Sequence, residues 1–444
     1  MKRRAFIKTG SVSLGALTLG PSIATASPIQ RFIVDSRGFQ GREDVEIIHE
    51  MQPVDLLIVE GSEDSLEASR ADFVPDRRHS RGDHRPVRQT RADDLQESED
   101  LSAYQWDKHD QGIPDAHETT RGEGTRVAII DSGIASGHPD LEGQVNLDLS
   151  RSFAEDDYGI GEPYAGTHGT HVAGIVAAND EDETGVVGSA PGTELVDLRV
   201  STANPASSDR NDLPPDYWGD TYYGSVLAAL VYAAEIGCDA ANLSLGWTWN
   251  MREEGWGRFW GSVHQRIGNY ARRNGTVHTH ASGNWGESLQ FNRDETDSSQ
   301  TAGGITTSAT GPIGFDPGTG EYDEPPYAPS TYTTHGVGAI DLAAPGGQGG
   351  ESEYDDVLNV TATPIFSDDG EYQGAEYGYG WLAGTSMAAP QVAGAVALVA
   401  SISQRSNANQ VMNVLRRTAE TPSEYENKYY GRGGYLDTLA AVLD

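Results

Sequence analysis

Apolar residues gather in blocks from residue 101 to the C-terminus, and two kinds of block alternate. One kind is short and aliphatic, which is typical of strands buried on both faces of a parallel sheet. These predicted strands are 126–130, 194–200 and 240–245. The other kind is longer and rich in alanine, valine and leucine, and predicts helices at 172–178, 222–236 and 390–401. Such alternation predicts an α/β fold: a three-layer α/β/α domain with a mostly parallel sheet over 101–444.

Residues 27–76 carry a pattern of their own. Aliphatic blocks at 31–34, 45–48 and 55–59 predict three short strands. The block 63–70 predicts a helix, for which Ser62 is a suitable N-cap. This stretch is therefore expected to form a small α+β unit ahead of the main domain.

Residues 77–100 break the pattern, because arginines crowd the first half and acidic residues the second. With almost nothing apolar to bury, the stretch is expected to be a charged, mobile and cleavable linker, cut within 76–102. An anion-binding basic patch is the alternative. Polar stretches rich in Gly and Pro are expected to be surface loops, at 201–220, 247–262 and 311–330.

The N-terminus has the features of an export signal. Arg3-Arg4 is a twin-arginine pattern, an uncharged stretch follows, and Ala24-Thr25-Ala26 fits the small-residue cleavage rule. We expect 1–26 to be a signal peptide used by the twin-arginine export machinery, and the mature form to be secreted and without a membrane anchor. Glycines, Pro21 and many hydroxyl side chains make the stretch too polar for a good membrane span.

The net charge of the chain limits its binding partners and indicates the salt concentration in which it works. The chain holds 67 acidic and 31 basic residues, a net charge of −36, and four of the basic residues are lysines. A phosphate backbone would be repelled, so nucleic-acid binding is excluded. The surplus of carboxylates with few lysines favours adaptation to high salt over an ordinary acidic secreted protein. The single cysteine, Cys238, excludes an intramolecular disulfide and is expected to be buried.

Three motifs carry the candidate chemistry: Asp131-Ser132-Gly133, His-Gly-Thr-His-Val-Ala-Gly at 168–174, and Gly-Thr-Ser-Met-Ala-Ala-Pro at 384–390. They place an acid, a base and a nucleophile in the order Asp, His, Ser, which is the order in subtilisin. Ala-Ser-Gly-Asn at 281–284 lies between the last two. The chain thus resembles the subtilisin-like serine proteases, the subtilase family. Its composition is similar to the halolysin group of halophilic secreted proteases.

The resemblance implies a role for each catalytic residue. Ser386 would be the nucleophile, His168 the general base, and Asp131 the carboxylate that orients His168. Asn284 and the backbone N–H of Ser386 would form the oxyanion hole. His171 is expected to be structural, since no His-Glu-x-x-His motif supports catalysis by a metal, and no cofactor is expected for catalysis.

The resemblance also implies binding residues. One wall of the substrate pocket would be Ser244, Leu245 and Gly246, and the other Ser282 and Gly283. Because these segments carry no charge, an uncharged, apolar P1 residue is expected. A structural Ca²⁺ is expected at Asp140 with Asp180 and Asp182, although such clustered carboxylates also arise from salt adaptation alone.

The sequence therefore predicts a secreted, salt-adapted serine endopeptidase that acts on protein or peptide substrates. It would be made as a zymogen, with 27–76 as a pro-segment that aids folding and inhibits the enzyme. Two alternatives stay open: a processing protease with few targets, and a non-catalytic binding protein on a protease scaffold.

Overall fold

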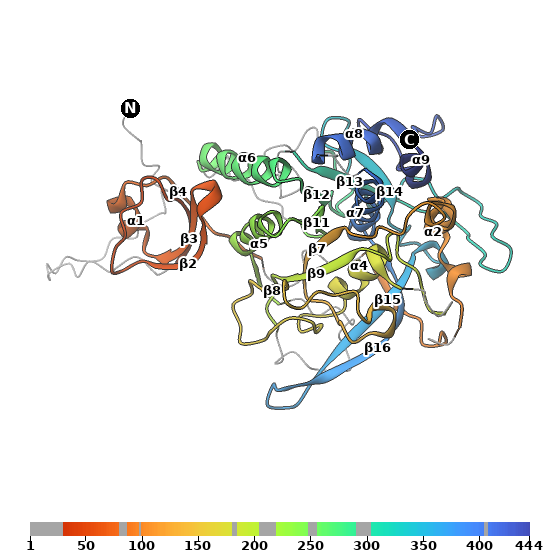
Figure 1. Ribbon diagram of the computed structural model, residues 1–444, viewed down its shortest axis with the longest axis horizontal. Helices are drawn as coiled ribbons and strands as arrows, with labels where there is room; N and C mark the ends of the chain where they lie inside the picture. Colours follow the sequence, from red (N-terminus) through yellow and green to blue (C-terminus); the bar gives the residue numbers. More distant parts are fainter. Residues whose placement is uncertain are drawn as a thin grey trace, which may run out of the picture.

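The computed structural model describes residues 30–79, 87–96, 99–179, 184–203, 219–246, 255–289, 303–403 and 407–444. Figure 1 shows a small N-terminal sheet beside a larger body in which helices cover a central sheet. The predicted signal peptide, 1–26, lies outside the described residues.

The small unit is an antiparallel sheet in the order β2-β3-β1-β4. Its strands are β1 (Gln30–Asp35), β2 (Glu46–Met51), β3 (Leu56–Gly61) and β4 (Phe73–Pro75), the last of which the pattern did not predict. Helix α1 (Glu63–Ser69) is capped as expected, because the Ser62 side chain accepts from the backbone N–H of Ser65. The expected α+β unit is thus present.

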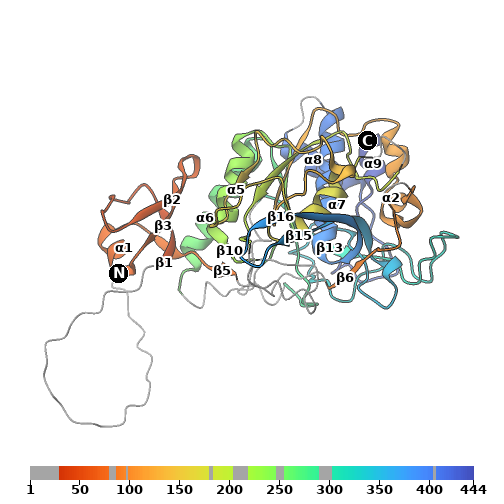
Figure 2. The same cartoon turned by 90° about the horizontal axis from the view of Figure 1, so that it is seen from below.

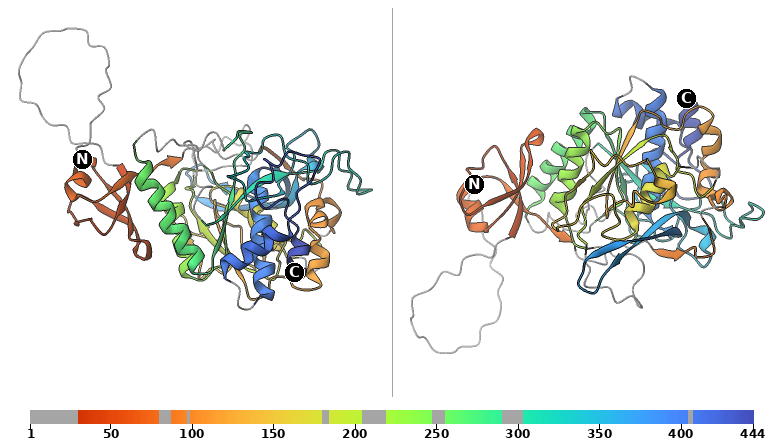
Figure 3. Two further views of the ribbon diagram at one scale, coloured as in Figure 1. Left: turned by 90° about the horizontal axis from the view of Figure 1, so that it is seen from above. Right: turned by 60° about the horizontal axis from the view of Figure 1, so that its bottom comes forward.

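Alternation along these strands gives the small sheet two apolar faces. One face packs on α1, through Phe32, Val34, Leu57, Val59, Leu66 and Phe73. The other packs on the body, against α5 (Tyr223–Glu235) and α6 (Gly257–Arg273), through Ile33, Met51, Leu56, Ile58 and Val74. Figures 2 and 3 show the small sheet lying beside these two helices.

The body is built on seven parallel strands in the order β14-β13-β12-β11-β7-β9-β8. They are β7 (Arg126–Asp131), β8 (Arg151–Ser152), β9 (Glu194–Arg199), β11 (Ala240–Leu243), β12 (Val277–Ala281), β13 (Ile305–Thr310) and β14 (Leu342–Pro345). α5 and α6 cover one face. The other face is covered by α4 (His168–Ala177) and α7 (Thr385–Ile402), with α8 (Ala408–Thr418) and α9 (Thr438–Leu443) behind them. The predicted three-layer α/β/α fold is confirmed.

Smaller elements complete the body. The first turns of the domain are α2 (Trp106–Asp110) and α3 (Ile113–His117), and the 3₁₀ turns are Gln52–Val54, Ser102–Tyr104, Pro139–Leu141 and Glu353–Asp355. Among the described helices, only α7 is long and apolar enough to span a membrane, and 83% of it is buried inside the protein. Cys238 is buried as expected, and burial raises the pKa of its thiol to about 12.

Two of the predicted boundaries are wrong. α7 begins at Thr385 rather than at Pro390, which lies inside the helix. Proline leaves the carbonyl four residues earlier without its helical donor, and here the Ser244 hydroxyl donates to that carbonyl, of Ser386 (2.7 Å). The expected loop 247–262 also ends early, because α6 starts at Gly257 and buries Trp260 against Tyr223.

Residues 77–100 were expected to form a mobile linker, but two segments of this stretch are paired strands. β5 (Arg78–His79) pairs with β10 (Thr221–Tyr222), and β6 (Arg88–Arg91) pairs with β16 (Tyr372–Ala383). β16 also pairs with β15 (Val357–Phe366), and Figure 2 shows β6 beside them. The arginines of β6 are paired: Arg88 meets Glu353 and Asp356, and the more exposed Arg91 meets Glu376. Residues 80–86 lie outside the described part of the chain.

Candidate active site

The candidate catalytic residues meet at one edge of the sheet. β12, β11 and β7 are neighbouring parallel strands, so their carboxyl ends share an edge. Asp131 is the last residue of β7, Ser244 directly follows β11, and Asn284 follows β12 in a turn. α4 and α7 pack against each other below this edge and supply His168 and Ser386 from their first turns.

Asp131 and His168 form a buried pair. The imidazole Nδ1 lies 2.9 Å from Oδ1 and 3.1 Å from Oδ2 of Asp131, and both side chains are at most 1% exposed. α4 can start this close to the Asp131 turn only because Gly169 has no side chain: a Cβ there would lie 2.5 Å from the carbonyl oxygen of Gly133. The Ser132 hydroxyl accepts from the backbone N–H of Gly169 (2.9 Å) and so caps the helix.

Ser386 is the second residue of α7 and is held from two sides by Ser244. Its Oγ donates to the carbonyl of Ser244 (3.1 Å), while the Ser244 hydroxyl donates to the carbonyl of Ser386. The hydroxyl therefore has to turn from Ser244 toward His168 before it can attack. At the N-terminus of α7 the helix dipole favours negative charge beside this serine.

Asn284 is oriented by the residue before the serine. Its Oδ1 accepts from both the backbone N–H and the hydroxyl of Thr385, each at 2.9 Å. Because a backbone N–H can only donate, these bonds fix which end of the amide faces Thr385. The NH₂ end consequently faces away from Thr385, where it can donate to a developing oxyanion.

His171 is enclosed, as the sequence predicted. Its Nε2 lies 3.2 Å from the carbonyl oxygens of both Val357 and Gly380, so it ties α4 to the β15–β16 hairpin. Burial lowers the pKa of His171 to about 3. This histidine stays neutral and structural at working pH.

The residues expected to bind substrate flank the same edge. Ser244, Leu245 and Gly246 continue from β11, and Ser282 and Gly283 continue from β12. Their side chains are largely engaged inside the protein: the Ser282 hydroxyl donates to the carbonyl of Thr334 (2.8 Å), and Leu245 is buried. Gly283 has a φ of +104°, and a Cβ there would collide with the indole of Trp285. Any pocket here is thus formed mainly by backbone and by Trp285.

Of the three expected calcium ligands, the structure describes Asp140; Asp180 and Asp182 lie outside the described residues. The Asp140 carboxylate accepts from the backbone N–H of Val186 (3.0 Å) and from the hydroxyl of Tyr379 (3.1 Å). Its carbonyl accepts from the backbone N–H of Asn179 (2.7 Å). Asn179 and Val186, which lie on either side of residues 180–183 in the sequence, are thereby both bonded to Asp140. Within the described residues, no three His, Cys, Asp or Glu side chains are grouped to hold a metal.

Sequence reasoning missed several supporting groups. Thr385 and Ser132 lie within the quoted motifs, yet their partners, Asn284 and Gly169, are distant in sequence. A buried carboxylate, Asp197 on β9, lies next to β7 and accepts from the backbone N–H of Gly161 (2.8 Å). Burial raises the pKa of Asp197 to about 6, and the charge of Asp131 adds to the rise. The motifs that contain Thr385 and Ser132 were the only signal for these two residues, and nothing in the sequence pattern indicated Asp197.

Comparison with known proteins gives a consistent result. The chain is 29% identical to thermitase of Thermoactinomyces vulgaris over 72% of its own length and 89% of that protein. It is 30% identical to subtilisin DY of Bacillus licheniformis, over 70% and 89%. It spans 64% of the thermophilic serine proteinase of Bacillus sp. strain AK1 and 41% of fervidolysin of Fervidobacterium pennivorans, at 29% identity to each.

Solved structures show the same fold over nearly the whole chain. The crystal structure of fervidolysin aligns with a TM-score of 0.65 at 20% identity, covering 96% of this chain and 62% of that one. The epidermin leader peptide processing serine protease of Staphylococcus aureus aligns with a TM-score of 0.65 at 18% identity, over 94% and 98%. Residues 122–433, which include all three catalytic motifs, match the Subtilase family, Peptidase S8. The chain belongs to the subtilase family.

Proposed function

We propose that this protein is a serine endopeptidase that hydrolyses peptide bonds through an acyl-enzyme. The observation that carries the proposal is the buried Asp131–His168 pair, at the sheet edge where Ser386 and the oriented amide of Asn284 also lie. An intact set of this kind argues against a non-catalytic binding protein on the same scaffold.

Each residue has a defined role in the proposed reaction. His168 takes the proton of the Ser386 hydroxyl, and Ser386 Oγ attacks the scissile carbonyl carbon. The tetrahedral oxyanion accepts from the Asn284 amide and the Ser386 backbone N–H. His168 then gives its proton to the leaving amine, while Asp131 stabilises the imidazolium. Water hydrolyses the acyl-enzyme by the same route in reverse.

Active-site labelling tests this proposal directly. The purified protein, in molar salt, is treated with a serine-directed fluorophosphonate and the adduct is mapped by mass spectrometry. We expect the adduct on Ser386, its loss in His168→Ala, and its retention in His109→Ala, which removes an exposed histidine. A protein that has lost residues 27–76 and still takes no label would overturn the proposal and favour the binding protein.

We further propose that 27–76 is an inhibitory pro-segment. It covers α5 and α6, and the chain that leaves it, β5, lies antiparallel to β10. β6, in contrast, is a full strand of the body, and its Arg88 is the cation beside the buried carboxylate of Asp356. Losing that arginine would leave Asp356 unpaired in the interior. The maturation cut is therefore expected before Val87, within the broader window 76–102.

The N-terminus of the active protein decides this point. Mass spectrometry should find it between residues 76 and 87, with β6 retained. A mature protein starting at Leu101 or later would contradict the retention of β6, and an uncut active protein would contradict the zymogen itself.

Export and salt adaptation rest on the sequence. Arg3-Arg4 supports secretion by the twin-arginine route, and the net charge of −36 supports work in concentrated salt. Replacing both arginines by lysine should retain the protein inside the cell. Dialysis to low salt should abolish activity, and full, lasting activity in dilute buffer would contradict the salt adaptation.

A structural Ca²⁺ is proposed at Asp140 with the carboxylates of 180–183, including Asp180 and Asp182. The donors are hard oxygen ligands, which suit Ca²⁺, and Asn179 and Val186, on either side of 180–183 in the sequence, are both bonded to Asp140. Chelation should lower the melting temperature in the parent protein and leave it unchanged in Asp140→Asn. An unchanged melting temperature in the parent would refute the site.

The relatives by fold illustrate two kinds of substrate specificity. One relative by fold is described as keratinolytic and another as processing a leader peptide. We favour an endopeptidase of broad range with an uncharged, apolar P1 residue, because the two pocket segments carry no charge. Cleavage of an unfolded protein at many sites would exclude a narrow processing protease, and cleavage mainly after Lys or Arg would refute the P1 assignment.

A further inference from the structure

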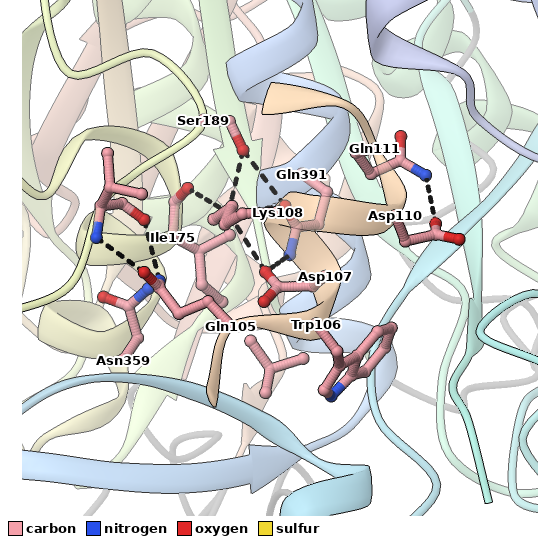
Figure 4. A network of polar contacts seen from close by, with 12 residues as sticks. Gln105, Trp106, Asp107, Lys108, Asp110, Gln111, Ile175, Ser189, Asn359 and Gln391 are labelled. Atoms are coloured by element: carbon pink, nitrogen blue, oxygen red, sulfur yellow. Dashed lines mark hydrogen bonds and ion pairs between the residues drawn. The ribbon is translucent and has the colours of Figure 1, made fainter. Parts of the chain in front are cut away.

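Lys108, on α2, is one of four lysines in the chain and its side chain is buried. Figure 4 shows its ammonium surrounded by oxygen atoms. Nζ lies 3.0 Å from the carbonyl oxygen of Ile175, 3.0 Å from Ser189 Oγ and 2.8 Å from Gln391 Oε1. A fourth neighbour, Asp107 Oδ2, lies at 3.2 Å. An ammonium has three protons to donate, so this one is fully engaged.

Burying this network costs free energy, and the polar groups of Lys108 and Gln391 within it are bonded to one another and to their neighbours. Moving an ammonium out of water costs several kcal/mol, and burial accordingly lowers the pKa of Lys108, which the Asp107 carboxylate opposes. That carboxylate also accepts from Gln391 Nε2 (2.6 Å). The Gln391 amide is thus held at both ends, its oxygen by Lys108 and its nitrogen by Asp107. Apolar side chains would fill the same space at lower cost, so the network calls for a reason.

The contacts of Lys108 join the two helices that carry the catalytic residues. Ile175 lies in the last turn of α4, seven residues after His168, which is about 10 Å along the helix axis. Gln391 lies five residues after Ser386 in α7, about 7.5 Å along that axis. Ile175 also accepts from the backbone N–H of Ser189 (2.9 Å). Lys108 therefore bridges the last turn of α4 and the second turn of α7.

We propose that Lys108, held by Asp107, is a positioning residue that fixes the register of α4 against α7 and thereby the approach of His168 to Ser386. This inference rests on the proposed peptidase function. No hydrogen bond within a single helix can set the distance between a base on one helix and a nucleophile on another. A misplacement of 1 Å in reacting groups can reduce a rate by about 10²-fold, so a polar bridge with defined lengths is useful here.

The competing explanation is that Lys108 only fastens α2 to the body. Gln111, which directly follows α2, provides the matched control. It is equally buried, and its amide donates to the carbonyl of Leu436 (2.9 Å) and accepts from the Thr438 hydroxyl (2.9 Å), so it fastens the same segment to α9 rather than to α4 and α7.

The test compares Lys108→Met and Gln111→Met, each produced as the full-length chain and assayed once mass spectrometry shows that residues 27–76 have been removed. For each, kcat and KM on a peptide and the rate of fluorophosphonate labelling at Ser386 are measured per folded molecule. We expect Lys108→Met to lower kcat and the labelling rate on the order of 10- to 100-fold with KM unchanged. Gln111→Met should change neither, even where its melting temperature falls. Equal rates in the two variants would overturn the proposal.

A second variant covers the case in which Lys108→Met does not fold. Gln391→Met leaves the Lys108–Asp107 pair intact and cuts only the connection to α7, and it should lower kcat in the same direction. If both variants fold, the double variant should lose no more than either single one, because one link is removed in each. Additive losses would contradict the bridge. Absence of label on the parent protein would instead refute the peptidase function.

Discussion

Two interfaces cover the two faces of the seven-stranded sheet, and they are built differently. Between α4, α7 and the β15–β16 hairpin, every residue of α4 is buried, and at two glycines the packing leaves no room for a side chain. A Cβ on Gly174 would lie 2.0 Å from Asn359 Oδ1, and one on Gly394 would lie 2.5 Å from the Cβ of Ser189. Close packing of this kind cannot open without leaving voids.

The interface of the N-terminal sheet with α5 and α6 has an apolar centre and a charged border. At the border, Arg266 Nη2 of α6 lies 2.7 Å from Asp35 Oδ2. Arg31 Nε and Asp76 Oδ2, 3.1 Å apart, both belong to the N-terminal unit and are buried where it meets α5. The other Asp76 oxygen accepts from the backbone N–H of Gly224 (2.7 Å) at the start of α5. Water and salt can replace such partners when the surfaces part. The difference supports the two proposals: a permanent interface that holds the candidate catalytic residues, and a second one that can separate when the pro-segment is removed.

Ser386→Ala should have the largest effect. Subtilisin, of the same family, is the case in which losing the nucleophile costs about 10⁶-fold in kcat. The small side-chain change should leave both interfaces intact, so the variant should accumulate as an uncut precursor. The expectation of an uncut precursor assumes that the chain cuts itself. Peptide hydrolysis measures the loss of kcat and mass spectrometry the uncut precursor, and a variant that still loses residues 27–76 when purified alone would show that the cut does not depend on Ser386.

Asn284→Ala should come second. Subtilisin is again the case from which the expected loss, about 10²–10³-fold in kcat, is taken. KM should stay unchanged, because the amide acts on the transition state. The Thr385 N–H and hydroxyl, which now donate to Asn284 Oδ1, would donate to water instead of to a side chain. A rise in KM at constant kcat would assign Asn284 to substrate binding rather than to the oxyanion.

Features that depend on neighbouring residues could be predicted from the sequence, and contacts between distant segments could not. The motifs at Asp131, His168 and Ser386 are contiguous, and helix and strand periods are local, so the sheet, α4 and the N-terminal unit were predictable. The pairing of β6 with β16 joins Arg91 to Gly380, and its register depends on a strand nearly 300 residues away. A run of arginines looks solvated until Glu376 and Asp356 are placed beside it. The same holds for Thr385 and Asn284, whose contact exists only in three dimensions.

The two interfaces should differ in how their stability depends on pH. His138 and His171 are buried in the core, and burial lowers their pKa values to about 4 and about 3. Unfolding returns each to about 6.5, so the unfolded state takes up protons first and stability is lost as pH falls below 6.5. The loss reaches about 3 kcal/mol for His138 by pH 4. Chemical denaturation between pH 7 and 4 measures it.

The N-terminal interface should respond less to pH, because two groups act in opposite directions. Burial lowers the pKa of His49 to about 4, which weakens docking as pH falls below 6.5. Burial raises the pKa of Asp76 to about 6, which strengthens docking as pH falls through 6. With Asp76 left to titrate, His49→Gln should therefore dock more tightly at pH 5 than at pH 7; with His49 left to titrate, Asp76→Asn should dock less tightly at pH 5 than at pH 7. Release of the cut segment at pH 7 and 5 measures both, and identical pH profiles in the two variants would contradict the assignment.

Arg266→Met should have the smallest effect. The change removes the ion pair from α6 to Asp35, but Arg37 still lies 2.5 Å from that carboxylate, so no buried charge is left unpaired. Because Arg37 keeps this largely buried carboxylate paired, we expect a loss of about 1 kcal/mol, which is about a fivefold faster release of the proposed pro-segment. Arg42→Met, which breaks a pair within the N-terminal sheet alone, should leave the release rate unchanged. A much larger effect of Arg266 would mean that the border rather than the apolar centre holds the segment in place. High salt would then promote separation, and the proposed pro-segment could not stay bound under the molar salt in which the protein is proposed to work.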